Sequence, residues 1–175
     1  ADFDGIILTH SQYFALALSK EYQLEFLNQE KAILRDYLRE VKRDRGAAKQ
    51  IQRALKTIES RITKVTNSER KDNHIDFENL QIDLIAIDEI QMFKNLSVIT
   101  KLNNVKGVQT SYSQRAMDNY MKMSHIIGNT LHNLQSKGGK IIGASGTVIS
   151  NSLCEVYTWL RIFAPKQLDE LGISA

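Results

Sequence analysis

The sequence predicts an α/β fold, in which helices cover both faces of a parallel sheet and a helical hairpin is inserted into the chain. Three short apolar runs rich in β-branched residues alternate with segments of helical periodicity. A long basic stretch with its own helical pattern separates the first two runs. Strands that alternate with helices favour parallel pairing, because each helix returns the chain to the same end of the sheet.

The composition excludes a membrane protein and a disulfide-stabilised one. Of the 175 residues, 42% are hydrophobic and 25% are charged, and no apolar run is long enough to cross a bilayer. The N-terminus has no signal-peptide pattern, and Cys154 is the only cysteine, so we expect a cytoplasmic protein with no membrane partner. Because the chain lacks an initiator Met and enters a strand almost at once, we expect Ala1 and Ala175 to be boundaries within a longer protein.

The first predicted strand covers residues 5–9, and the helical pattern follows from about residue 22 to residue 65. Gly46 lies between two apolar stripes and would permit a tight turn, so we predict an antiparallel helical hairpin over residues 22–70 that projects from the body. One long helix is the alternative, because a single glycine costs only about 1 kcal/mol in a helix interior. The stripes are Leu24, Leu27, Leu34, Leu38 and Val41, then Ile51, Leu55, Ile58, Ile62 and Val65.

After the hairpin the chain returns to the sheet. A short helical turn is predicted at residues 77–80 and a second buried strand at residues 83–87, followed by an irregular segment to about residue 112.

The last third of the chain contains two helices around one strand. A helix capped by a serine is predicted over residues 113–136, where a pair of glycines stops it. A third buried strand covers residues 140–145. Ser150 or Asn151 opens a final helix, which halts before Pro165.

The net charge of +3 conceals an uneven distribution. Between residues 31 and 71, thirteen Lys and Arg stand against five Asp and Glu, so this segment carries +8 and the remainder −5. A basic projection on an acidic body indicates sequence-independent contact with nucleic-acid phosphates; a solvated helical face is the alternative. Tyr37 is the only aromatic residue in the segment, which argues against stacking of single-stranded bases. The predicted contact residues are Lys42, Arg43, Arg45 and Lys49.

Two adjacent acids, Asp88 and Glu89, follow the second strand. The carboxyl ends of the strands are where open α/β sheets hold ligands. In nucleotide hydrolysis one such carboxylate holds Mg²⁺, usually through water, and the other orients and activates the attacking water. Acids at a strand end also serve as caps or aid solubility, and the pair alone does not decide between these roles.

Small and hydroxyl residues follow the third strand. Ser145 and Thr147 could hydrogen-bond to the acids at the end of a neighbouring strand, and Gly146 permits a close approach or a positive φ. The alternative is a simple turn followed by helix capping at Ser150 or Asn151.

Taken together, the two segments resemble motifs of the Swi/Snf-like superfamily 2 helicases. Residues 88–95 resemble the Asp-Glu-Ala-His box, which is closely followed by Lys-Asn in this family. Residues 145–152 resemble the third motif, commonly Thr-Gly-Thr-Pro followed by an Asn, and the likeness continues through residues 153–161 and in residues 3–13. It covers essentially the whole chain. The nearest resemblance is to the helicase portion of very large phage and conjugative-element proteins, which often join a helicase to a DNA methyltransferase.

The resemblance implies a three-layer, RecA-like domain of the P-loop NTPase type, the first of two motor domains in an ATP-dependent DNA helicase or translocase. It implies that Asp88 binds Mg²⁺ and that Glu89 is the catalytic base. Gln91 stands where the box has histidine, as in a related box, and would link hydrolysis to domain closure. Val148 replaces the usual proline of the third motif, which loosens the turn.

The same resemblance assigns coupling roles. Ser145 and Thr147 would couple the ATP state to binding of duplex DNA. Lys94 and Asn95 match the Lys-Asn pair and would position the loop after the box, and Asn151 matches the asparagine that follows the third motif.

One motif of the family is absent from these 175 residues. The sequence contains no Gly-x-x-x-x-Gly-Lys-Ser/Thr segment to hold phosphates. The resemblance implies that this loop precedes Ala1 and that the second motor domain follows Ala175, so we expect the chain alone to be nearly inert as an ATPase. It also implies that the strand with Ile141 and Ile142 is an exposed edge here, or that it pairs with a neighbouring molecule. A non-catalytic DNA- or protein-binding scaffold on a degenerate motor fold is the alternative function.

Overall fold

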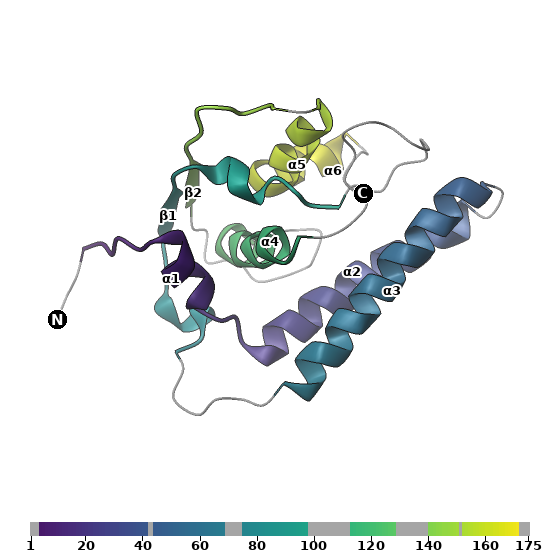
Figure 1. Ribbon diagram of the computed structural model, residues 1–175, viewed down its shortest axis with the longest axis horizontal. Coiled ribbons are helices and arrows are strands. Elements are labelled where there is room, and N and C mark those ends of the chain that lie inside the picture. The colour runs from purple at the N-terminus through teal and green to yellow at the C-terminus, as the bar shows by residue number, and fades with distance from the viewer. Residues whose placement is uncertain are drawn as a thin grey trace.

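The computed structural model describes residues 4–41, 44–68, 75–97, 113–128, 140–150 and 152–171. Figure 1 shows β1 and β2 side by side, with α4 beside them and α6 next to α5, while the α2–α3 hairpin extends away from the strands. The elements are α1 His10–Ala15, α2 Lys20–Glu40, α3 Arg45–Asn67, η1 Phe77–Leu80, β1 Leu84–Ile87, η2 Ile90–Phe93, α4 Gln114–Ile127, β2 Lys140–Gly143, α5 Cys154–Phe163 and α6 Pro165–Glu170.

The second and third predicted strands form a parallel pair, in which Leu84 lies opposite Lys140 and Ile87 opposite Gly143. This confirms a mixed fold with parallel pairing, although the described residues are mostly helical. The prediction that both strands are buried is wrong, since Leu84 and Ile142 are each 53% exposed. Two strands leave much of the sheet uncovered in the described part of the chain. The exposed side chain of Ile142 lies on a face of the pair that the described residues leave uncovered.

The first predicted strand is absent. Residues 5–9 are extended but belong to no sheet, and the side chains of Ile6 and Ile7 are 73% and 99% exposed. The chain then enters α1, whose first turn is closed by a reciprocal capping box between Thr9 and Gln12. An apolar extended run becomes a strand only where a neighbour offers backbone partners, and neither described strand pairs with this run.

The basic segment folds as the predicted hairpin and not as one long helix. Gly46, however, does not form the turn, because it lies in the first turn of α3. The carboxylate of Asp44 breaks the helix by accepting hydrogen bonds from the backbone N–H of Gly46 at 2.9 Å and of Ala47 at 3.1 Å. The buried residues between the helices are Leu27, Leu34, Val41, Ala47, Ile51, Ala54 and Ile58.

The hairpin is fixed to the body through α2. The hydroxyl of Tyr22 donates to the carbonyl of Met121 in α4 at 3.1 Å. Farther along, Glu30 lies 3.7 Å from the guanidinium of Arg161 in α5, and both side chains are nearly buried. Arg161 also donates to the carbonyl of Ser97. The hairpin therefore projects from the body only beyond these contacts.

Helix α4 is the centre of the core. Ser113 caps it as predicted, but the helix ends at Ile127 because Gly128 adopts a left-handed conformation with φ of 61°. Residues 129–136, which were also predicted to be helical, lie outside the described residues. The methionines of α4 are packing residues, since Met117, Met121 and Met123 are all buried.

A buried lysine on α4 joins that helix to α1. The ammonium of Lys122, whose side chain is fully buried, lies 2.7 Å from the carboxylate of Asp118 and donates to the carbonyl of Tyr13 at 2.9 Å. Burial lowers the pKa of Lys122 and raises the pKa of Asp118. The hydrogen bond from Lys122 to Tyr13 ties α1 to α4, and Asp118 balances the charge of the buried ammonium within α4.

The final helix begins later than predicted and is not capped by Ser150. Helix α5 starts at Cys154 without a side-chain cap at Leu153, and the N–H of Cys154 donates to the hydroxyl of Ser152 at 3.2 Å. The N–H and hydroxyl of Ser150 bond to Glu155 instead. It ends at Phe163 as expected, and Pro165 then opens α6. In the described ranges, no helix combines the length and apolar character needed to traverse a bilayer.

Candidate functional site

The ends of β1 and β2 meet at one edge of the sheet. Past the last paired residues, the N–H of Ala144 donates to the carbonyl of Ile87 at 2.8 Å, and the N–H of Ile90 donates to the carbonyl of Ala144 at 3.0 Å. The two acids after β1 and the hydroxyl residues after β2 therefore leave the sheet next to each other. Such an edge is where parallel sheets bind ligands.

Gly143, at the end of β2, allows the close approach of side chains from α5 and η2. A β-carbon at this position would lie 2.7 Å from the ring of Phe163 and 2.8 Å from the side chain of Ile90. The sequence-based assignment of this task to Gly146 is wrong, because no atom lies within 4 Å of a β-carbon built there. Gly146 has no positive φ either.

Asp88 and Glu89 are both exposed to solvent. Asp88 accepts a hydrogen bond from the N–H of Glu89 at 3.0 Å, and its own carbonyl lies 2.9 Å from Nε2 of His10 in α1. Glu89 has a left-handed backbone with φ of 51° and ψ of 44°, which costs a residue with a side chain about 1–2 kcal/mol. Strain of this kind, held in place by neighbours, is common at functional sites.

Gln91 contacts the second acid directly. Its side-chain amide donates from Nε2 to Oε2 of Glu89. Its Oε1 is buried and accepts no hydrogen bond from the described residues. The amide thus orients the carboxylate of Glu89 and keeps one acceptor available for a donor from elsewhere.

The hydroxyl residues share the edge but do not bond to the acids. The hydroxyl of Ser145 accepts from the N–H of Thr147 at 3.1 Å, so it is engaged in its own turn. Across the described residues, no hydrogen bond links Asp88 or Glu89 to Ser145 or Thr147. The expected direct bond is therefore missing, while the expected proximity of the two strand ends is present.

A nearly buried ion pair links the two loops instead. The ammonium of Lys94 lies 2.9 Å from Oε1 of Glu155, with side-chain exposures of 15% and 9%. Lys94 also donates to the hydroxyl of Ser150, and the other carboxylate oxygen of Glu155 accepts from the N–H of Ser150 at 2.7 Å. The loop after the acids, the loop after β2 and the start of α5 are thus tied at one point.

Glu155 was missed by sequence reasoning, which assigned it no role. The spacing of Ser152 and Glu155 matches the Ser-x-x-Glu pattern of a helix start, and this pattern could have placed Glu155 in the first turn. The ion pair with Lys94 could not be predicted in this way, because the fold brings the two residues together from distant parts of the chain.

The other predicted site residues lie apart from this edge or outside the described residues. The carbonyl of Asn95 accepts from the N–H of Ser113 at 3.3 Å, which joins the loop to the start of α4. Arg45 and Lys49 are exposed on α3 of the hairpin. Asn151, Lys42 and Arg43 lie outside the described residues.

The possible metal ligands at this edge of the sheet are the separate carboxylates of Asp88 and Glu89. Among the residues that the structure describes, no group of three or more His, Cys, Asp or Glu side chains could enclose a metal ion. Mg²⁺ is commonly bound through one or two carboxylates, water and substrate phosphates, so the exposed carboxylate of Asp88 has the chemistry this ion requires.

Comparison with known proteins places the chain in a family. A family model described as a probable helicase domain matches residues 1–175. No curated protein and no solved structure gives a significant match. The matched region includes both the strand edge and the basic hairpin.

Proposed function

The chain belongs to the family of probable helicase domains, and from that premise we propose that it is part of an ATP-dependent DNA helicase or translocase motor. The observation that carries the proposal is the meeting of the two motif-bearing strand ends at the carboxyl edge of the parallel pair. We assign the motor to the Swi/Snf-like superfamily 2 and the chain to its first RecA-like domain. The phosphate loop, a second RecA-like domain and a DNA methyltransferase domain belong to the full-length protein in this proposal.

Asp88 is the proposed Mg²⁺ ligand, acting through water. Its exposed carboxylate stands at the edge where a nucleotide would meet the sheet, and His10 holds its backbone carbonyl. Mg²⁺ bound together with ATP would offset the negative charge of the phosphate oxygens.

Glu89 is the proposed general base. Its carboxylate accepts the proton of the attacking water, and the amide of Gln91 restricts the direction in which that carboxylate points. The unused Oε1 of Gln91 supports a role in closure, because a donor supplied by the second domain would satisfy a buried acceptor only in the closed state.

Lys94 and Glu155 are the proposed connection between the two motifs. Because their ion pair joins the loop after Glu89 to the segment that carries Ser145 and Thr147, a shift of one loop displaces the other. In this proposal, Ser145 and Thr147 respond to the ATP state through that connection and transmit it to the DNA.

The test is the substitution Glu89→Gln in the full-length protein. DNA-stimulated ATP hydrolysis should fall by a factor on the order of 10²–10⁴, the usual contribution of a general base, while nucleotide binding stays unchanged. Asp83→Asn is the matched control, since Asp83 is an exposed acid just before the opposite end of β1. Undiminished turnover in the Glu89→Gln protein would remove Glu89 from the mechanism.

A DNA- or protein-binding scaffold without ATPase activity is the second candidate. It is favoured by Val148, which stands in place of the proline of the third motif and is 59% exposed. This function predicts that the wild-type full-length protein binds DNA and hydrolyses no ATP, so that Glu89→Gln changes neither property.

A further inference from the structure

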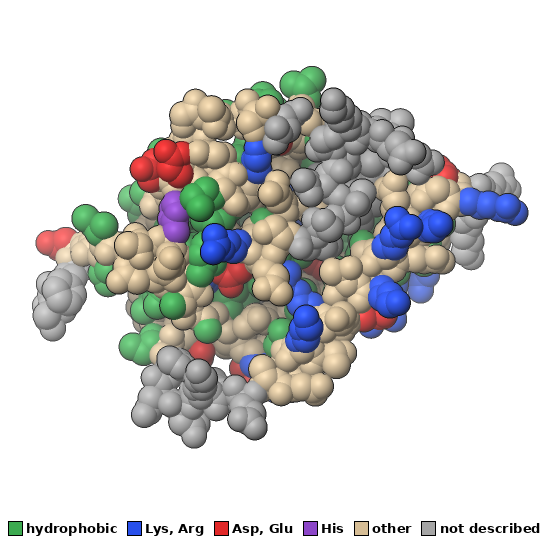
Figure 2. Space-filling model, in the orientation of Figure 1, with side chains coloured by type: hydrophobic (Ala, Val, Ile, Leu, Met, Phe, Trp, Pro, Cys, Tyr) green, Lys and Arg blue, Asp and Glu red, His purple; other side chains and the backbone are tan. Residues whose placement is uncertain are grey.

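One face of α3 carries a stripe of exposed cations. Side chains three, four or eight residues apart lie on the same side of a helix, and on an ideal helix this set falls within an arc of roughly 100°, opposite the buried face. Figure 2 shows Lys and Arg side chains gathered along the hairpin, with little acidic surface between them. The stripe consists of Arg45, Lys49, Arg53, Lys56 and Lys64, all of which are exposed.

The charges of this stripe are not neutralised by the hairpin. The only acid within α3 is Glu59, and its carboxylate turns toward α2, 2.8 Å from Lys31 and 3.7 Å from Arg35. These cations lower the pKa of Glu59. In the part of the chain that is described, no stripe residue forms an ion pair.

A groove on the body side of the stripe adds a concave surface. It has a volume of about 480 Å³ and is lined by Arg53, Lys56, Arg61 and Lys64 together with Gln114 at the start of α4. The guanidinium of Arg61 donates to the carbonyl of Gln114 at 3.3 Å, which closes one wall. Several positive groups therefore converge on one hollow.

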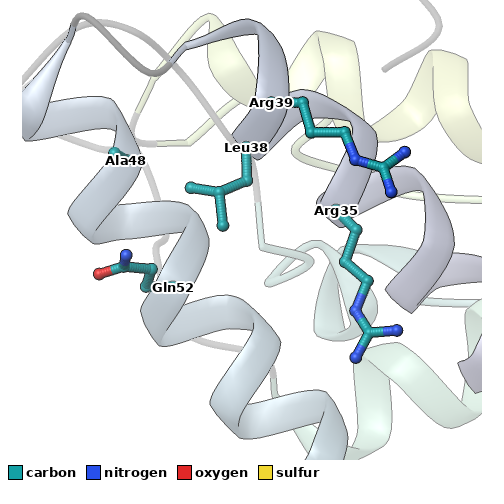
Figure 3. Close-up of a pocket in the computed structure, with 5 residues that line it drawn as sticks. All are labelled: Arg35, Leu38, Arg39, Ala48 and Gln52. Atoms are coloured by element: carbon teal, nitrogen blue, oxygen red, sulfur yellow. The ribbon is translucent and has the colours of Figure 1, made fainter.

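The other groove of the hairpin differs in its electrostatics. Figure 3 shows Arg35 and Arg39 on α2 beside Leu38, opposite Gln52 on α3. Here each arginine has an acidic partner: Arg39 lies 2.7 Å from Asp36, and Arg35 lies close to Glu59. Equal numbers of positive charges can thus be removed from a compensated surface and an uncompensated one.

We propose that the α3 stripe, defined by its five residues above, binds the phosphate backbone of duplex DNA. This inference rests on the proposed function and assigns the DNA contact to the length of α3 and not only to the hairpin tip. From Arg45 to Lys64 the stripe is roughly 28 Å long at 1.5 Å per residue. One turn of B-DNA is about 34 Å, so the stripe spans most of a turn.

The composition of α3 favours a duplex over a single strand. Single-strand binding surfaces stack bases on aromatic side chains, and α3 contains none. A duplex presents about one phosphate charge per 1.7 Å of its axis on its outside, which matches a regular row of exposed cations. Contacts of this kind read no sequence, as a translocating motor requires.

The test measures binding of the full-length protein to a mixed-sequence DNA duplex of about two turns, without ATP. Arg53→Gln/Lys56→Gln removes two stripe charges, and Arg35→Gln/Arg39→Gln removes two compensated ones. Fluorescence anisotropy between about 50 and 200 mM salt gives the slope of log K against log salt. The magnitude of the slope should fall by about 1.8 in the stripe variant, because two phosphate contacts are lost and each contributes about 0.9. The control variant should keep the wild-type slope.

An unchanged slope in the stripe variant overturns the inference, and so does an equal loss in both variants, which would make net charge the cause. Tighter wild-type binding to a single strand of equal length also overturns it. Both variants change exposed side chains, and circular dichroism verifies that each remains folded. The binding assay contains no ATP and is therefore independent of the ATPase test. Normal ATP turnover in the Glu89→Gln protein would refute the proposed motor and would leave the measured salt slope valid.

Discussion

Removal of the Lys94–Glu155 ion pair measures how firmly the two motif loops are joined. At 2.9 Å, two unit charges attract by about 6 kcal/mol at an effective dielectric constant of 20, before desolvation is subtracted. Both side chains are largely buried, so desolvation cancels more than half of that attraction. We therefore expect a coupling free energy of about 2 kcal/mol between the two side chains.

The assay is a double-mutant cycle on the chain. Urea unfolding of the wild type, Lys94→Met, Glu155→Gln and the double variant gives four free energies of unfolding, and their combination isolates the pair. Asp36 and Arg39 form the matched control, since they lie 2.7 Å apart but are 68% and 75% exposed. Their cycle should give about 0.2–1 kcal/mol.

A coupling below about 0.5 kcal/mol for Lys94 and Glu155 would refute the reasoning, because exposed pairs already reach that value. It would mean that Ser150, which bonds to both residues, holds the loops together without the ion pair.

Three further perturbations test the hairpin, the alkaline stability and the strained acid. Ile58→Ala should lower the free energy of unfolding by about 2–5 kcal/mol, because Ile58 is 1% exposed between α2 and α3; urea unfolding that loses less than 1 kcal/mol contradicts this packing. Burial raises the pKa of Tyr22 above its usual 10, so the folded state retains a proton that the unfolded state releases above about pH 10. The contribution of Tyr22 to the free energy of unfolding is fully present below pH 10 and then falls by about 1.4 kcal/mol per pH unit. Tyr22→Phe should reduce the slope of the free energy of unfolding against pH by that amount, and an unaltered slope would contradict a raised pKa of Tyr22. Glu89→Gly should be about 1 kcal/mol more stable than Glu89→Ala in thermal unfolding, since glycine relieves the positive φ; the reverse order, usual for loops, would show that no strain is stored there.

Local sequence patterns identified most of the elements. The apolar runs at β1 and β2, the two stripes of the hairpin, the turn at η1 and the serine cap of α4 all appear in the structure. Each depends on residues close together in the chain, such as the carboxylate of Asp44, which caps α3 from two residues away. The adjacent strand ends that define the candidate site also followed from the alternation of strands and helices.

The failures share a cause, which is dependence on distant partners. Residues 5–9 have the composition of a strand but pair with neither described strand, and composition cannot reveal this. Helix α4 stops at Gly128, which the sequence pattern did not distinguish from the other glycines, because a glycine ends a helix only where its backbone takes up the left-handed conformation.

The sequence alone determined which chemical groups the chain carries: two acids after one apolar strand, hydroxyls after the next, and a basic amphipathic hairpin ahead of both. Periodicity and charge are properties of neighbouring residues, so no fold is needed to recognise them. The tertiary structure decided which groups meet. It brought Lys94 to Glu155, set Gly143 against Phe163, and turned Glu59 toward α2 so that the stripe on α3 kept its charge. Contacts between residues far apart in the chain depend on how the helices and strands pack, and the order of residues does not encode that packing locally.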